Sequence, residues 1–143
     1  NGERHERSTP VLLSLKNEKI KYFASGGASV IALTEGGSLY SWGLGISGRL
    51  GTGDEENSPL PQRIEFFDRL NLKVTKIRGK GGHVLAQTED GGLFSWGLGT
   101  HGRLGHFDEH NQVIPKQIEF FRNRKVISFA AGMDHSVVVV EEE

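Results

Sequence analysis

An internal repeat constrains this chain more than any other feature of its sequence. The stretch SWGLGISGRLGTGDEENSPLPQRIEFF at residues 41–67 returns as SWGLGTHGRLGHFDEHNQVIPKQIEFF at residues 95–121, 54 positions later and without a gap. Extended back to Thr34 and Thr88, the alignment holds 21 identities in 34 positions. A repeat of about 50 residues with strand-like runs and glycine turns is typical of a blade or solenoid unit, which cannot bury its apolar face alone.

Each copy predicts a meander of short strands. In the first copy, β-rich runs at residues 22–25, 29–34 and 38–42 are separated by pairs of glycines, and two-residue glycine turns between such runs predict hairpins. A fourth strand is expected at residues 62–67 and again at 116–121, where apolar and polar residues alternate. The long loop before it, residues 43–61, has recurring Gly, Arg and Leu positions, so we interpret it as part of the scaffold.

The repeat divides the chain into four parts. We expect the end of a preceding blade at residues 1–19, full repeats at 20–73 and 74–125, and the first strands of a following blade at 126–143. The predicted fold is all-β: a β-propeller of four-stranded blades, here a partial array of about two full blades plus two half blades. Because the chain starts and stops inside a unit, we expect a portion of something longer. The remaining blades would come from the same chain or from other copies that close a ring.

Composition argues against several classes of partner and chemistry. The formal net charge is −1 and the pI is near 6.7, so no overall basic field exists to attract nucleic acid or an anionic membrane. No apolar run approaches the roughly 18 residues of a membrane span. The absence of cysteine removes thiol catalysis and Cys-ligated zinc. It also fits a reducing, intracellular compartment, cytoplasmic or nuclear.

Two apparent ligand motifs fail on their context. GLGISG from Gly43 and GLGTHG from Gly97 spell half of a dinucleotide-binding fingerprint, but Arg-Leu-Gly follows where a helix should begin. His101, His106 and His110 fall close together in a glycine-containing loop, without a placed partner to complete a zinc site. No recurring Ser/His/Asp set or pair of carboxylates is visible either. We therefore expect a protein that is not an enzyme, with no cofactor and no metal.

The residues that recur are interpreted as scaffold. Two tryptophans that end the third strand should pack their large faces between neighbouring blades. Loop leucines should enter the core, loop arginines should donate to carbonyls, and histidines before the second strand should be buried and hold the turn. These structural residues are Trp42, Trp96, Leu50, Leu104, Arg49, Arg103, His83, His135 and Gly132.

A fixed order of short motifs runs through the copies. G-x-x-H-S, complete at Gly132, His135 and Ser136, is followed by an alternating strand, T-E-D-G, a strand ending in S-W-G, then G-x-L-G and a proline-led last strand. This order resembles the repeats of the regulator of chromosome condensation family, and the resemblance covers nearly the whole chain. It implies a seven-bladed β-propeller with one repeat per four-stranded blade. The other copies depart from the motif at Ser29, in place of His, and at Lys80, in place of Gly.

Tryptophan-aspartate propellers are the nearest rival fold, but each Trp here is followed by Gly. Three functions stay open. The first is a non-catalytic module that presents loops to a protein partner within a larger protein or assembly. The resemblance implies a second, guanine-nucleotide exchange on a Ran-like small GTPase. The third is a purely architectural propeller in a ligase, kinase or cytoskeletal complex.

The positions that differ between the two full copies locate the expected partner surface. Recurring positions hold the blade together, whereas variable ones are free to serve a partner, and the differences cluster in the loop before the fourth strand. Phe107 is the strongest candidate, because a large apolar residue at a loop tip is costly to leave in water. The alternative is that Phe107 folds back onto its own blade. The loop candidates are Ile46, Ser47, Glu56, His101, His106, Phe107 and His110.

Overall fold

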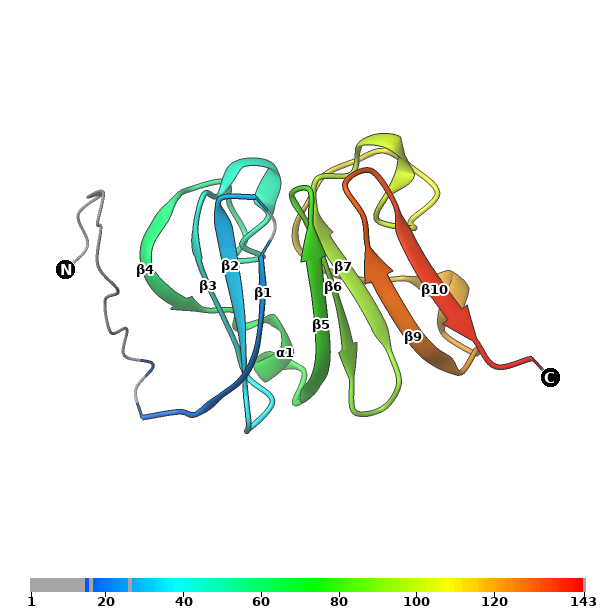
Figure 1. The fold of residues 1–143 in the computed structure, drawn as a ribbon, viewed down its shortest axis with the longest axis horizontal. Coiled ribbons are helices and arrows are strands. Elements are labelled where there is room, and N and C mark those ends of the chain that lie inside the picture. Colours follow the sequence, from blue (N-terminus) through cyan, green and yellow to red (C-terminus); the bar gives the residue numbers. More distant parts are fainter. Residues whose placement is uncertain (1–14, 16, 26, 143) are drawn as a thin grey trace.

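The chain forms antiparallel sheets that stand side by side (Figure 1). The computed structural model describes residues 15, 17–25 and 27–142. The first sheet contains β1 (Ile20–Ser25), β2 (Ser29–Thr34), β3 (Leu39–Gly43) and β4 (Ser58–Arg63). The second contains β5 (Val74–Lys80), β6 (His83–Thr88), β7 (Leu93–Gly97) and β8 (Gln112–Gln117). The third pairs β9 (Val126–Ala131) with β10 (Ser136–Val140).

The four helical segments of the described residues are short. Three are 3-10 turns and one is a single turn of α-helix. They are η1 (Ile46–Gly48), α1 (Phe66–Arg69), η2 (Thr100–Gly102) and η3 (Glu119–Phe121).

The first strands of neighbouring sheets touch, and the sheets fan out from that line. β1 contacts β5, and β5 contacts β9. Within each full sheet the strands follow chain order, and the turn before the third strand depends on a glycine at positive φ, +86° at Gly37 and +89° at Gly91. This is the arrangement of propeller blades. The predicted all-β propeller fold is confirmed, with two four-stranded blades followed by half of a third.

The predicted limits of the fourth strands are wrong. β4 and β8 each begin four residues before the predicted strand, at Ser58 and Gln112. In the first copy the last residues of the predicted strand form a turn of helix instead, because Phe66 and Phe67 are consecutive and both pack inward, whereas consecutive residues of a strand face opposite sides. Pro61 lies inside β4, where an outer strand tolerates the missing N–H.

The core lies between sheets and not within any one of them. Ile31, Leu33 and Leu39 of the first sheet pack against Ile77 and Val84 of the second, all at most 3% exposed. A second cluster joins the far face of the second sheet to β9, with Leu85, Leu93, Ile118, Val126 and Phe129. Each sheet therefore obtains its buried surface from its neighbour.

Trp96 is the largest side chain at the first of these interfaces. It is fully buried, and its ring centroid lies 6.1 Å from that of Phe67. Gly51, in the loop of the first sheet, lies flat against the indole: a Cβ at this position would come within 2.7 Å of Trp96 Nε1. Trp42, the equivalent tryptophan, is half-buried and packs edge-on against Phe23.

Arg103 and His83 tie the second sheet to the third. Arg103 is buried, and its Nη1 donates to the Met133 carbonyl at 2.7 Å while its Nη2 meets Asp134 at 3.2 Å. Ser136 Oγ donates to the Arg103 carbonyl at 2.7 Å and lies 3.0 Å from His83 Nε2. Because the hydroxyl proton is already committed, Nε2–H must donate to Ser136.

The two histidines before the second strands have different surroundings. His83 is fully buried, and burial together with the Arg103 guanidinium lowers its pKa to about 4. His135 is exposed, so its predicted burial is wrong. The third sheet has two described strands, and no further sheet among the described residues covers His135 as Ser136 covers His83. Its ring rests on Gly132, where a Cβ would come within 2.5 Å of His135 Cε1.

The four predicted parts of the chain remain a prediction in their limits. The sheets span residues 20–63, 74–117 and 126–140, inside the predicted units. Most of the predicted first part, residues 1–14 and 16, lies outside the described residues. Leu15 is described and packs against Ala32 and Tyr40 in the face of the first sheet.

Replacing Gly51 with Ala should destabilise the protein more than replacing Gly91 with Ala. Both glycines have positive φ, +71° and +89°, but a Cβ at Gly91 meets nothing within 4 Å whereas one at Gly51 meets the Trp96 indole. The backbone cost is therefore shared, and the clash should add about 1–3 kcal/mol. Denaturant unfolding of both variants measures the difference, and equal midpoints would show that the loop yields without strain.

The stability of the protein should increase from pH 4 to pH 6.5 in a way that depends on His83. Its pKa is about 4 in the fold against 6.5 when unperturbed, so the unfolded chain binds the extra proton over this range. Stability is then complete above pH 6.5 and falls by about 3 kcal/mol as the pH drops to 4. Other groups titrate too, so the measured quantity is the difference in pH slope between the wild type and His83→Ser. Identical slopes would mean that His83 is not held neutral.

Candidate functional site

The loops that join β3 to β4 and β7 to β8 share one backbone conformation. Each leaves its strand through a glycine at positive φ, +101° at Gly43 and +99° at Gly97. Ser47 and His101 then both adopt φ of 64°, a region that residues with side chains rarely enter. Two different sequences are therefore held on the same scaffold.

A recurring D-E-x-N segment, which was not among the predicted scaffold residues, maintains this scaffold. In the first loop Asn57 Oδ1 accepts a hydrogen bond from Gly45 N–H at 2.9 Å, and Asp54 Oδ1 accepts one from Glu56 N–H at 3.0 Å. The second loop repeats both bonds at the same lengths. The signal was present in the sequence, because both the Asp and the Asn recur at the 54-residue offset.

The structure divides the loop candidates by exposure. Ile46 is 53% exposed, and Glu56, His101 and His110 are exposed as well. Ser47 is only 8% exposed, so its side chain does not offer the contact expected from the sequence. The accessible candidates come from both loops, at the same end of the two sheets (Figure 1).

His106 contributes to the scaffold of its own loop. Its Nε2 lies 2.9 Å from Ser95 Oγ, which in turn donates to the Leu104 carbonyl at 2.6 Å. Burial and the charge of Lys116 lower the pKa of His106, so the neutral ring is favoured. Ser41 makes the same bond to the Leu50 carbonyl in the first sheet, at 2.8 Å. Both leucines are buried, as the loop anchors were expected to be.

Phe107 is the most exposed large apolar side chain of the described residues, at 86%. Its ring centroid lies 6.0 Å from that of Phe120, so it touches its own unit. In the first copy this position is Gly53, whose N–H donates to the Val113 carbonyl in β8 of the next sheet at 2.9 Å. Gly53 thus stands where one blade meets the outer strand of the following blade, and Phe107 occupies the equivalent position on the second blade.

The described residues include two serine–histidine pairs, and neither has the arrangement of a nucleophile and its base. Ser136 and Ser95 both donate their hydroxyl proton to a backbone carbonyl, and the partner histidines are buried or half-buried. A nucleophile must instead give its proton to the base and face a substrate. Among the described residues, no group of three or more histidine, aspartate or glutamate side chains is arranged to hold a metal ion. No helix in the described part of the chain is long and apolar enough to cross a membrane.

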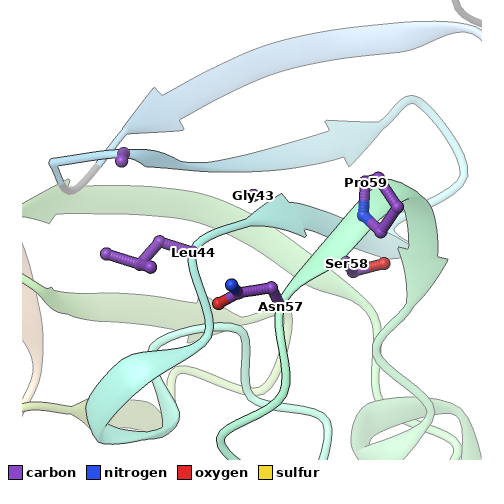
Figure 2. Close-up of a pocket in the computed structure, with 6 residues that line it drawn as sticks. Gly43, Leu44, Asn57, Ser58 and Pro59 are labelled. Carbon is purple, nitrogen blue, oxygen red and sulfur yellow. The ribbon is translucent and has the colours of Figure 1, made fainter. Parts of the chain in front are cut away.

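Figure 2 shows a hollow on the first sheet. At the equivalent place on the second sheet, a loop of the first sheet is packed. The volume of the hollow is about 200 Å³ and its lining is Ala28, Gly43, Leu44, Asn57, Ser58 and Pro59. On the second sheet the equivalent positions include Gly82, Gly97 and Val113. There the loop of the first sheet fills the space: a Cβ at Gly97 would lie 3.3 Å from Arg49 Cα, and one at Gly48 would lie 2.5 Å from Val113 Cα. Arg49 is further held by its Nε–H, which donates to the Ile46 carbonyl at 2.9 Å.

Comparison with known proteins agrees with this geometry. The Regulator of chromosome condensation (RCC1) repeat matches residues 36–87 and 90–139. The human E3 ubiquitin-protein ligase HERC2 is 37% identical over 144 residues, which is 99% of this chain and 3% of HERC2. The ultraviolet-B receptor UVR8 of Arabidopsis thaliana is 33% identical over 139 residues, which is 96% of this chain and 31% of UVR8.

A solved structure shows the same fold. The crystal structure of Prp20p from Saccharomyces cerevisiae superposes with a TM-score of 0.70 and 29% identity, covering 84% of this chain and 31% of Prp20p. The chain thus spans less than a third of each of these proteins. Each matched repeat runs from the last two strands of one sheet into the first two of the next, so sequence repeat and blade are out of phase. On these matches, which cover well over half of its length, the chain belongs to the family of proteins built from RCC1 repeats.

Proposed function

We propose that the chain is a non-catalytic β-propeller module that presents its β3–β4 and β7–β8 loops to a protein partner, as part of a larger protein or assembly. The observation that carries this proposal is one loop scaffold with different exposed residues in its two copies. Loops on a rigid scaffold are where binding residues concentrate. HERC2 is a ubiquitin ligase and UVR8 a light receptor, so the shared repeat accompanies unrelated activities, which supports a modular role.

The contact residues we assign are the exposed loop side chains Ile46, Glu56, His101 and His110. All four lie at positions where the two copies differ. We assign Phe107 to packing against a following blade, because its equivalent Gly53 bonds to the neighbouring sheet. The partner surface is therefore the tips of the loops, while their flanks serve blade packing.

Two other functions compete with this one. Prp20p is described as having binding properties to Gsp1p and histones, and its likeness to this chain favours guanine-nucleotide exchange on a Ran-like small GTPase as the second candidate. The third is a purely architectural propeller, for which the ligase HERC2 offers a setting. An architectural blade needs no variable exposed tips, and this chain has them.

Replacing Ile46, His101 and His110 together with Ala should weaken a loop-bound partner by about 1–4 kcal/mol in total, the range of an interface hot spot. Thermal stability should stay unchanged, because all three side chains are exposed. A matched control changes Leu70, Gln62 and Asn123 to Ala, also exposed and away from the loops. Quantitative cross-linking and mass spectrometry on the whole protein compare the two variants. If both retain the same partners in the same amounts, the loop assignment fails.

A nucleotide-exchange assay should show no stimulation of a Ran-like GTPase by the protein. The proposed function requires binding alone, so release of a fluorescent guanine nucleotide should proceed at the intrinsic rate at saturating protein. Prp20p itself provides the positive control in the same assay. Stimulated release that is lost in the Ile46, His101 and His110 variant would establish the exchange function in place of the proposed one.

A further inference from the structure

The first strands of the sheets carry basic residues that are not part of the proposed loop surface. β1, β5 and β9 contain four basic residues and no acidic residue, although the net charge of the chain is −1. These residues are Lys21, Lys76, Arg78 and Lys80. None of them forms an ion pair with another described residue, whereas Arg63, Arg69 and Arg122 each lie within 3 Å of a carboxylate at distances of 2.7, 2.9 and 2.6 Å.

Three of these cations share one face of β5. From Lys76 onward the strand pairs regularly with β6, so alternate residues point the same way about 6.8 Å apart. The residues between them point toward the first sheet: Ile77 is buried there, and a Cβ at Gly79 would lie 3.5 Å from Ala24 Cβ. Lys76, Arg78 and Lys80 therefore occupy the face on the side of β9, which lies beside β5 in Figure 1.

The middle cation is held in place without being neutralised. The Arg78 guanidinium carbon lies 5.3 Å from the ring centroid of Tyr22 and 5.9 Å from that of Phe129. Its Nη1 donates to the Ile77 carbonyl at 2.7 Å. Contacts with aromatic faces orient a guanidinium and leave its full charge for a ligand. Lys76 and Lys80 are exposed on either side of it.

The repeat architecture does not require these cations. The equivalent positions in the first and last copies of the repeat are occupied by neutral residues. They are Tyr22, Ala24 and Gly26 in the first copy and Ser128, Ala130 and Gly132 in the last. Three like charges on one strand face repel one another, so the second blade carries a cost that its neighbours avoid. A ligand of opposite charge would remove that cost.

We propose that Lys76, Arg78 and Lys80, hereafter the basic strip, bind an extended acidic segment of a protein partner that has a carboxylate at every second residue. An extended peptide repeats every second side chain at the same spacing of about 6.8 Å, so its carboxylates match the strip. A guanidinium and two ammonium groups suit carboxylate oxygens. The inference rests on the proposed function and names the chemistry of a partner, at a surface separate from the loops.

A peptide fits the strip better than a nucleic acid does. The strip is three residues long. The loops at the end of the sheets where β5 ends carry exposed carboxylates at Glu55, Glu56 and Glu109. A long polyanion that reached the strip would lie against these carboxylates and be repelled. A short acidic segment can engage the strip and avoid them.

Fluorescence anisotropy with the whole protein tests the proposal. The probe is a labelled peptide with four aspartates alternating with serine and glycine, and the comparison peptides carry the same four aspartates in a row or asparagine in their place. The alternating peptide should bind most tightly, and its affinity should fall between about 50 and about 300 mM NaCl, as exposed ion pairs are screened. A labelled single-stranded oligonucleotide is measured in the same way as a third comparison ligand.

The variant Lys76→Gln with Lys80→Gln should bind the alternating peptide about fivefold more weakly, since two exposed ion pairs are lost. The matched control, Lys116→Gln with Lys125→Gln, removes the same charge elsewhere and should bind like the wild type. Should the first variant not fold, protection of Lys76 and Lys80 from acetylation by the bound peptide decides in the wild-type protein. The proposal is overturned by equal affinity for all peptides, by equal binding of both variants, by unprotected lysines, or by tighter binding of the oligonucleotide. The variant with Ile46, His101 and His110 changed to Ala should bind the peptide like the wild type. This result would show that the strip binds independently of the loops.

Discussion

The structure depends on the packing of one sheet against the next. A four-stranded sheet of this length has apolar residues on both faces, and neither face can be buried by the sheet itself. The interface around Trp96 shows how the requirement is met: Phe67 from the end of one blade and Gly51 from its loop both contact the indole of the next. Because the same residues recur, each interface is built from the same parts. Stability is then a property of the array and not of a blade.

This requirement gives the long loops two tasks. Their glycines and buried leucines clamp a blade onto its neighbour, which explains why Gly48, Arg49, Leu50 and Gly51 return unchanged in the second copy. Their tips, held in shape by D-E-x-N hydrogen bonds, are released from packing and differ between copies. Positions that pack against the next blade and exposed positions that differ between the copies thus alternate over a few residues of one loop. Exposure alone does not separate them: Phe107 is 86% exposed and Ile46 is 53% exposed, but only Phe107 occupies a position whose equivalent, Gly53, bonds to the neighbouring sheet.

Charged side chains, like the loop residues, differ in their surroundings from one part of a blade to another. The outer strands and helical turns pair their arginines with nearby carboxylates, while the first strands carry cations that lack such partners among the described residues. Between the second and third sheets, by contrast, burial favours the neutral form of His83, and the Arg103 guanidinium is hydrogen bonded to carbonyls and paired with Asp134. An ionised histidine there would carry the cost of a buried charge beside a guanidinium. Of the first-strand cations, Lys21, Lys76 and Lys80 are exposed to solvent.

The sequence by itself determined the repeat, the all-β propeller class, the glycine turns and the loop residues that serve as anchors, because these follow from local periodicity and from recurrence at 54 residues. Tertiary structure decided where β4 ends, since Phe66 and Phe67 turn inward together only when a neighbouring sheet receives both. It also decided that His83 is buried while His135 is exposed, and that the three cations of β5, at every second position of the strand, lie on its β9 side. Such outcomes depend on which blade covers a residue, and the local pattern of apolar and polar residues does not report a contact with a residue about 50 positions away.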